Sequence, residues 1–141
     1  MQQRVAITGL GVVSPVGLDV ASVAASLEEG RSGIRLLRTP PLERDFAAGV
    51  VDASFEDRFT RIELPFLDRC QQMALVAAAQ ATRDAGMDSL EGLGQRAGVY
   101  YGNVNGGVAT AQAWYEQMLL HARQAARPFT AMTIMGNAGA A

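Results

Sequence analysis

The stretch RVAITGLGVVSPVG at residues 4–17 decides the fold of this chain. A short apolar run at residues 5–7 meets Gly9 and Gly11, and a second apolar pair follows before Pro15. The run is too short for a helix, and β-branched residues flanked by glycines favour a buried strand. We therefore expect the chain to begin with a buried strand that turns at the glycines.

A nucleotide-binding turn is the first alternative for this stretch. A dinucleotide site needs Gly-x-Gly-x-x-Gly where a strand turns into a helix, so that the helix N-terminus meets the pyrophosphate. Gly9 and Gly11 fit the first two positions, but Ser14 occupies the third, and Pro15 disfavours helix there. No strand that ends in a lone acidic residue follows about twenty residues later. The simpler interpretation is that the glycines let the strand turn and pack closely.

Composition sets the broad class of the protein. The 141 residues are enough for one compact domain, and 49% apolar with 18% charged residues is a globular composition. A net charge of −2 gives no electrostatic footprint for nucleic acid. No apolar run reaches the roughly 18 residues of a membrane span, and no signal-peptide pattern opens the chain. A single cysteine, Cys70, excludes an internal disulfide and fits the cytoplasm, so we expect a cytoplasmic protein with no membrane partner.

Helices and strands are expected to alternate along the chain. Helical periodicity and glycine stops predict helices over residues 19–29, 67–85 and 108–123. Short apolar runs predict strands over residues 5–7, 48–51 and 96–102. Residues 55–64 are expected to be irregular with a helical turn, and residues 129–141 to form a buried apolar stretch. This alternation predicts a layered α/β fold.

The end of the chain has an unusual composition for a domain boundary. Residues 137–141 are small and apolar, inside what looks like a buried helix, with no polar tail. Domains usually end at exposed polar segments. We therefore expect residues 1–141 to be an incomplete N-terminal domain.

Five segments, in order along the whole chain, resemble the N-terminal part of the β-ketoacyl-acyl-carrier-protein synthases. The matching segments are residues 5–17, 27–34, 68–86, 98–107 and 128–138. Each segment alone is weak evidence, but five in the right order and spacing are strong evidence.

The resemblance implies a thiolase-like α/β fold with α/β/α/β/α layers, of which this chain would carry the N-terminal half. Such enzymes work as homodimers in fatty-acid or polyketide synthesis and need no metal or other cofactor. A cysteine takes an acyl group from a carrier protein or CoA. Two histidines assist decarboxylation of a malonyl unit, and the resulting carbanion attacks the acyl-cysteine. The cysteine thiolate needs a helix N-terminus and an oxyanion hole.

The resemblance places no catalytic residue in this chain. The family's nucleophilic cysteine and both histidines would lie beyond Ala141. Cys70 falls on the apolar face of the expected second helix, where a free thiol usually packs. His121 lies near the end of a helix, where it is expected to be solvated or paired with the helix dipole. The chain would supply scaffold, dimer contact and part of the acyl-pocket wall.

Three residues fall by order on the family's acyl channel: Asn105, Thr133 and Ile134. Many long-chain enzymes carry an aliphatic residue at the position of Asn105. A buried amide beside an alkyl chain is costly, so Asn105 would suit a shorter or more polar acyl group. The alternative is that Asn105 only makes a turn, because asparagine tolerates left-handed backbone.

The implied partner is an acyl carrier protein, which is acidic. Arg58, Arg61, Arg123 and Arg127 are the candidate contacts. Related enzymes often carry more basic residues just before the second helix, so we expect slower and less salt-sensitive docking here. The alternative is that residues beyond this chain supply the basic patch.

A second function shares the same N-terminal pattern. A chain-length-factor subunit is a non-catalytic paralogue that pairs with a true ketosynthase as a heterodimer. The two differ at the nucleophilic cysteine, which lies outside these residues, so the sequence leaves both functions open.

Overall fold

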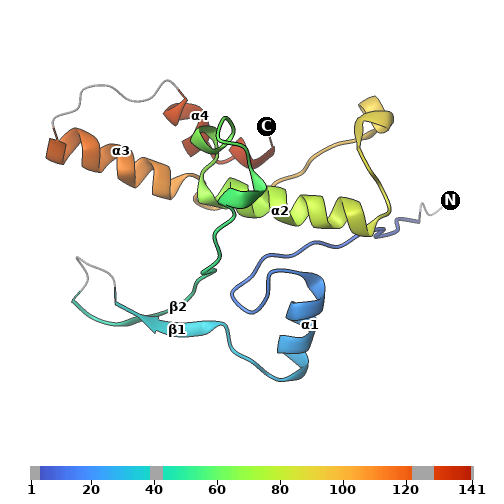
Figure 1. Cartoon of the computed structure of the whole chain (residues 1–141), viewed down its shortest axis with the longest axis horizontal. Coiled ribbons are helices and arrows are strands. Elements are labelled where there is room, and N and C mark those ends of the chain that lie inside the picture. Colours follow the sequence, from blue (N-terminus) through green and yellow to red (C-terminus); the bar gives the residue numbers. More distant parts are fainter. Residues whose placement is uncertain (1–3, 39–42, 122–128, 141) are drawn as a thin grey trace. The chain divides into compact units, whose positions relative to one another are not determined.

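The computed structural model describes residues 4–38, 43–121 and 129–140 and divides into two compact units. The first unit comprises residues 1–54 and 77–89, and the second comprises residues 55–76 and 90–141. The long helix α2, Arg69–Asp84, contributes its C-terminal half to the first unit and its N-terminal half to the second. Figure 1 follows these elements in sequence colours.

Helix α1, Val20–Glu28, forms in the first unit as predicted. The Asp19 carboxylate accepts a hydrogen bond from the Ser22 N–H at 2.7 Å, and the Ser22 hydroxyl accepts one from the Asp19 N–H at 3.2 Å. This reciprocal capping box satisfies two backbone donors that the first turn would otherwise leave free. Gly30, at φ +64°, ends the helix in the left-handed region, where glycine carries no steric cost.

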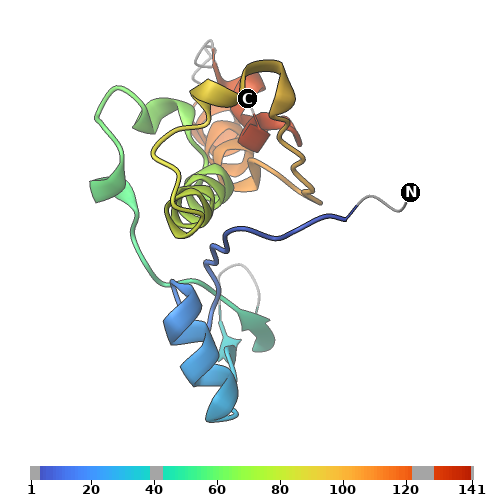
Figure 2. The ribbon, with the colours of Figure 1, turned by 90° about the vertical axis from the view of Figure 1, so that its right-hand side faces the viewer.

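The first unit also holds a β-hairpin that the sequence predicted only in part. Strand β1, Ile34–Leu37, pairs antiparallel with β2, Phe46–Gly49, with Ile34 opposite Gly49. The predicted strand over residues 48–51 overlaps β2 but begins two residues late, and no strand was predicted at β1. The four residues of β1 are exposed apart from the last, so they lack the alternation that identifies a strand. Figures 1 and 2 show the hairpin in cyan beside the blue helix α1.

The prediction of a buried strand at residues 5–7 is wrong. The structure assigns no strand there, and Val5 and Ile7 are 94% and 82% exposed. A strand requires a ladder of backbone hydrogen bonds with a neighbour. None of the described segments of this chain provides that ladder, so the apolar run stays extended and uncovered.

Side chains of α2 take over part of the role of a neighbouring strand. The Leu10 N–H donates to the Asp84 carboxylate at 2.9 Å, and the Val12 N–H donates to the Gln80 side-chain oxygen at 3.0 Å. The Gln80 side-chain amide also donates to the Leu18 carbonyl at 2.7 Å. The backbone of the opening segment is therefore fixed to α2 at three points.

Gly9 and Gly11 allow this close approach. A Cβ on Gly9 would lie 2.7 Å from the Ala85 nitrogen, and one on Gly11 would lie 2.8 Å from the Ala81 nitrogen. Both glycines thus lie against the backbone of the C-terminal half of α2. The close-packing interpretation is confirmed. The glycines do not open a helix N-terminus, which a pyrophosphate site would require.

The second unit is mainly helical. Besides the N-terminal half of α2 it contains the helices α3, Val108–His121, and α4, Thr130–Ile134. Four short 3-10 turns accompany them: η1, Glu56–Arg58; η2, Leu64–Phe66; η3, Glu91–Arg96; and η4, Ala138–Ala140. Helix α4 contacts α3, η2 and η4, and the Phe66 and Phe129 rings meet edge-to-face with centroids 4.5 Å apart. Figure 2 shows the orange α3 and the red α4 together.

Two further sequence predictions fail in this unit. Residues 96–102 do not form a strand: η3 runs to Arg96, and Val99 and Tyr100 beyond it are exposed. The apolar stretch 129–141 is not one buried helix, because α4 stops where Met135 turns extended at ψ 140°. For the first segment the cause is again the lack of a ladder partner in the described part of the chain.

Helices and strands thus coexist, as an α/β sequence pattern predicts, but β1–β2 is the one ladder among the described residues. The layered arrangement of several strands is therefore not formed within them. No helix in the described ranges has both the length and the apolar character to cross a membrane.

Candidate functional site

A glycine turn in the second unit packs against two of the three predicted acyl-channel residues, Thr133 and Ile134. Gly107, at φ +69°, is buried, and a Cβ there would lie 2.6 Å from the Thr133 carbonyl oxygen and closer still to the Ile134 Cα. Asn105 lies two residues before this glycine and is exposed. Backbone contact therefore joins the turn to Thr133 and Ile134, while Asn105 is an exposed residue just before the contact.

Thr133 is the most buried of the three, at 4% exposure. Its hydroxyl lies 3.1 Å from the Phe129 carbonyl and 3.4 Å from the Phe66 carbonyl. A threonine hydroxyl has a single proton to donate, and both carbonyls are acceptors. Thr133 therefore presents only acceptor lone pairs to any bound group.

Thr133 also lines a cavity of about 330 Å³ in the second unit. Its walls come from η2, α3 and α4, and the lining residues are Leu64, Pro65, Leu67, Thr110, Ala113, Trp114, Gln117, Thr130 and Thr133. Asn105 and Ile134 do not line it. Among the described residues that line it none carries a charge, so the cavity suits a neutral ligand of modest size.

Asp68 holds the start of both long helices. One carboxylate oxygen accepts from the Cys70 N–H at 3.1 Å, and the other accepts from the Thr110 N–H at 2.9 Å and the Thr110 hydroxyl at 2.7 Å. Burial raises the pKa of Asp68, but these hydrogen bonds outweigh burial and lower it overall. Sequence reasoning missed this residue. The available signal was an aspartate near the start of the helix predicted over residues 67–85, since aspartate is a preferred N-cap.

We expect Asp68→Asn to destabilise the N-terminus of α3 by about 2–3 kcal/mol at about pH 7, because an amide NH₂ faces donors and charge-assisted bonds are lost. The lowered pKa means that the carboxylate's contribution is present above its unfolded pKa of about 3.9 and is lost as pH falls through its folded pKa. Hydrogen exchange of the Thr110 amide, in the protein encoded by the complete gene, measures the loss of stability at the start of α3. The exposed Asp57→Asn is the control. Equal protection in the two variants would contradict the role of Asp68.

Cys70 is half-buried in α2, with its sulfur 3.4 Å from the Gly107 nitrogen and 4.0 Å from the Asn103 amide nitrogen, both of which donate to it. Burial and the neighbouring Cys70 and Asp68 raise the pKa of the Tyr101 phenol. The thiol is thus one member of a packed polar group around the glycine turn. His121 closes α3, and its side chain lies outside the described residues.

The predicted carrier-protein contacts are only partly described. Arg58 ends η1, is exposed, and has its side chain 3.5 Å from the Asp57 carboxylate, while Arg61 lies exposed in the following turn. Arg123 and Arg127 lie outside the described residues. The Arg69 guanidinium lies over the Phe55 ring at 5.7 Å, an arrangement that the sequence did not predict.

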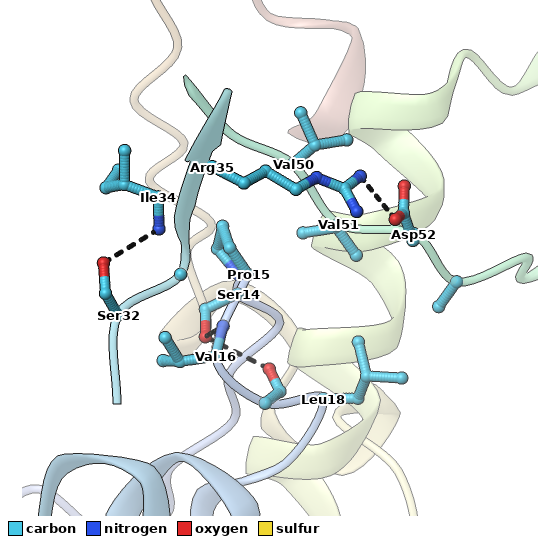
Figure 3. Close-up of a pocket in the computed structure, with 13 residues that line it drawn as sticks. Ser14, Pro15, Val16, Leu18, Ser32, Ile34, Arg35, Val50, Val51 and Asp52 are labelled. Carbon is cyan, nitrogen blue, oxygen red and sulfur yellow. Dashed lines mark hydrogen bonds and ion pairs between the residues drawn. The ribbon is translucent and has the colours of Figure 1, made fainter. Parts of the chain in front are cut away.

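A second cavity, of about 420 Å³, lies in the first unit (Figure 3). Pro15 lies against the hairpin, since a Cβ on Gly33 would fall 2.8 Å from the Pro15 Cβ. Arg35 reaches across to pair with Asp52 beside Val50 and Val51. None of the predicted site residues lines this cavity. Within the described ranges, no group of three or more His, Cys, Asp or Glu could hold a metal ion.

Comparison with known proteins agrees with this arrangement. The sequence model of the family "Beta-ketoacyl synthase, N-terminal domain" matches residues 2–141. The chain is 33% identical over 130 residues to the 3-oxoacyl-[acyl-carrier-protein] synthase 2 of Staphylococcus aureus, covering 90% of this chain and 31% of that protein. It is 31% identical over 142 residues to nodulation protein E of Rhizobium meliloti, covering 99% of this chain and 35% of the relative.

The fold has a solved counterpart. A β-ketoacyl synthase from Burkholderia phymatum superposes with a TM-score of 0.74 at 23% identity, covering 95% of this chain and 34% of that one. The chain thus spans about a third of the length of the relatives it matches. The matched family covers nearly every residue, including the opening glycines, the glycine turn and α4. This chain belongs to the β-ketoacyl synthase family and carries its N-terminal domain.

Proposed function

We propose that this chain is the N-terminal domain of a 3-oxoacyl-[acyl-carrier-protein] synthase, active in fatty-acid or polyketide synthesis. The observation that carries the proposal is the family match over residues 2–141, together with a glycine turn packed on α4. The comparisons give no observation that favours the non-catalytic chain-length-factor alternative.

The proposed reaction has two stages. A cysteine thiolate attacks the thioester carbonyl of an acyl carrier protein, the carrier thiolate leaves, and an acyl-cysteine forms. Malonyl-carrier protein then loses carbon dioxide, and the carbanion left behind attacks the acyl carbonyl and releases the cysteine. The nucleophile and two histidines are proposed to lie in sequence beyond Ala141. This domain supplies the scaffold, with Asn105, Thr133 and Ile134 on the acyl-pocket wall.

The thiolase-like layers are part of the same proposal. Residues 5–7 and the segment around Val99 are apolar, extended and exposed, which suits strands of a larger sheet. The exposed apolar side chains of α3, among them Leu119 and Leu120, suit a contact with a second subunit. We propose residues 1–141 as an incomplete domain within a dimer, homodimeric for a synthase.

Docking of an acidic acyl carrier protein is assigned to Arg58 and Arg61, with Arg123 and Arg127 as further contacts. Exposure of the first two supports the assignment. Because Arg58 already lies near the Asp57 carboxylate, its positive field is partly neutralised. Weak steering of the carrier follows. The cytoplasmic location stays a prediction.

The test uses the protein encoded by the complete gene. Incubation with acyl carrier protein thioesters should give a covalent acyl-enzyme in intact mass spectra, and addition of malonyl-carrier protein should release a 3-oxoacyl product. A chain-length factor would form no acyl-enzyme and would act only with a partner ketosynthase. Absence of both acylation and malonyl decarboxylation would refute the proposal.

Asn105→Leu should change acyl selectivity. If the Asn105 amide borders the acyl chain, its removal should raise the ratio of kcat/KM for dodecanoyl over butanoyl substrate by about tenfold, since an unpaired buried amide costs about 1–3 kcal/mol. Competition between the two acyl thioesters measures the ratio. If Asn105 only makes the turn, Asn105→Leu should lower the melting temperature and leave the ratio unchanged.

A further inference from the structure

Trp114 carries a buried polar atom that the described residues leave without a partner. Its side chain is half-buried on α3, and its indole Nε1 is shielded from solvent with no hydrogen-bond acceptor among them. Buried N–H groups in folded proteins are nearly always paired, so an orphaned one calls for an acceptor from water or from a ligand.

Trp114 belongs to the wall of the cavity of about 330 Å³ that Thr133 also lines. Thr110, Trp114 and Gln117 lie on one face of α3, at helical spacing. The Thr110 hydroxyl is already bound to Asp68, and the Thr133 hydroxyl to backbone carbonyls. Within the described part of this wall, the indole N–H is a buried donor without a partner.

The cavity wall also restricts what could supply the acceptor. None of the described lining residues carries a charge, which disfavours a carboxylate or a phosphate, since a buried charge needs a partner. Leu64, Pro65 and Leu67 form an apolar side, which suits carbon chain. The matching ligand is neutral and mostly aliphatic, with one acceptor oxygen.

We infer that Trp114 is a specificity-determining residue that hydrogen-bonds a keto or hydroxyl oxygen on the acyl chain, so that the protein prefers oxygenated over plain alkyl acyl groups. This inference rests on the proposed function, because the cavity shares Thr133 with the proposed acyl-pocket wall. The chemistry involves no bond making: the indole N–H donates and the acyl oxygen accepts.

The test compares acyl-enzyme formation from hexanoyl and 5-oxohexanoyl thioesters by the protein from the complete gene. Trp114→Phe keeps an aromatic ring and removes the donor, so it should reduce the preference for the oxo substrate by about three- to tenfold. Tyr115→Phe removes an exposed hydroxyl from the same helix and is the matched control, which should leave the preference unchanged. An unchanged preference in Trp114→Phe would mean that water satisfies the indole, and would overturn the inference.

A second measurement does not depend on the variant or on turnover. With isotope-labelled tryptophan, the Trp114 indole N–H resonance should shift when 2-hexanone is added and stay in place with hexane at equal concentration. No shift with either ligand would also overturn the inference. Failure of acylation with every thioester refutes the proposed function instead, so the two failures are distinguishable.

Discussion

Gly11→Ala should destabilise the first unit by about 3 kcal/mol or more, at the upper end of the cost of overpacking. The new Cβ would lie far inside the van der Waals contact distance of the Ala77 carbonyl oxygen and 2.8 Å from the Ala81 nitrogen. Both atoms belong to the α2 backbone, which cannot rotate away as a flexible side chain could. The opening segment would have to leave the helix, and the Val12 hydrogen bond to Gln80 would break with it.

Soluble yield, thermal unfolding and hydrogen exchange of the Val12 amide in the protein from the complete gene check this expectation. Gly102→Ala is the matched control, because a Cβ there meets nothing within 4 Å and its φ is ordinary. Val12 exchange in Gly11→Ala as slow as in Gly102→Ala would show that the glycine does not touch the helix.

Gly107→Ala should cost a similar amount for two separate reasons. Its φ of +69° costs a residue with a side chain about 1–2 kcal/mol. In addition, the Cβ would lie 2.6 Å from the Thr133 carbonyl oxygen and even nearer the Ile134 Cα, so the turn would separate from α4. We expect a total of about 3 kcal/mol or more.

Gly86→Ala separates the two contributions. Gly86 has φ +68°, but a Cβ on it meets nothing within 4 Å, so this variant bears only the backbone cost. Urea unfolding of both variants, with hydrogen exchange of the Thr133 amide as the local readout, gives the difference. Equal destabilisation in both would rule out the contact between the glycine turn and α4.

Local signals predicted the helices well and the strands poorly. Asp19 with Gly30 and the apolar periodicity of residues 67–85 mark helices whose hydrogen bonds lie within the segment. The runs at residues 5–7 and 96–102 are apolar enough for strands, but a strand depends on a distant partner. Strand β1 shows the opposite case. Its residues are mostly exposed, so they show no alternation of apolar and polar residues that would predict a strand, yet β1 forms because it pairs with β2.

The site was predicted by resemblance rather than by pattern. Residue order pointed to Asn105, Thr133 and Ile134, whose place on an acyl-pocket wall stays a prediction, and Gly107 packs against the last two of them. Asp68 and Trp114 were missed, because what distinguishes them is a hydrogen bond to Thr110 across 42 residues and the lack of one at a buried indole. Neither of these conditions leaves a trace in local sequence, although an aspartate near the start of a predicted helix is a local N-cap signal for Asp68.

Gln80 lets the opening segment tolerate changes of its own side chains. A primary amide carries a donor and an acceptor as a peptide group does, and here it binds the Val12 N–H and the Leu18 carbonyl at once. The position of the segment along the helix is therefore set by main-chain atoms, whatever side chains the segment bears. Substitution of Val5 or Ile7 can alter the exposed surface without shifting that alignment. Replacing Gln80 by glutamate would remove the amide donor and with it the hydrogen bond to the Leu18 carbonyl.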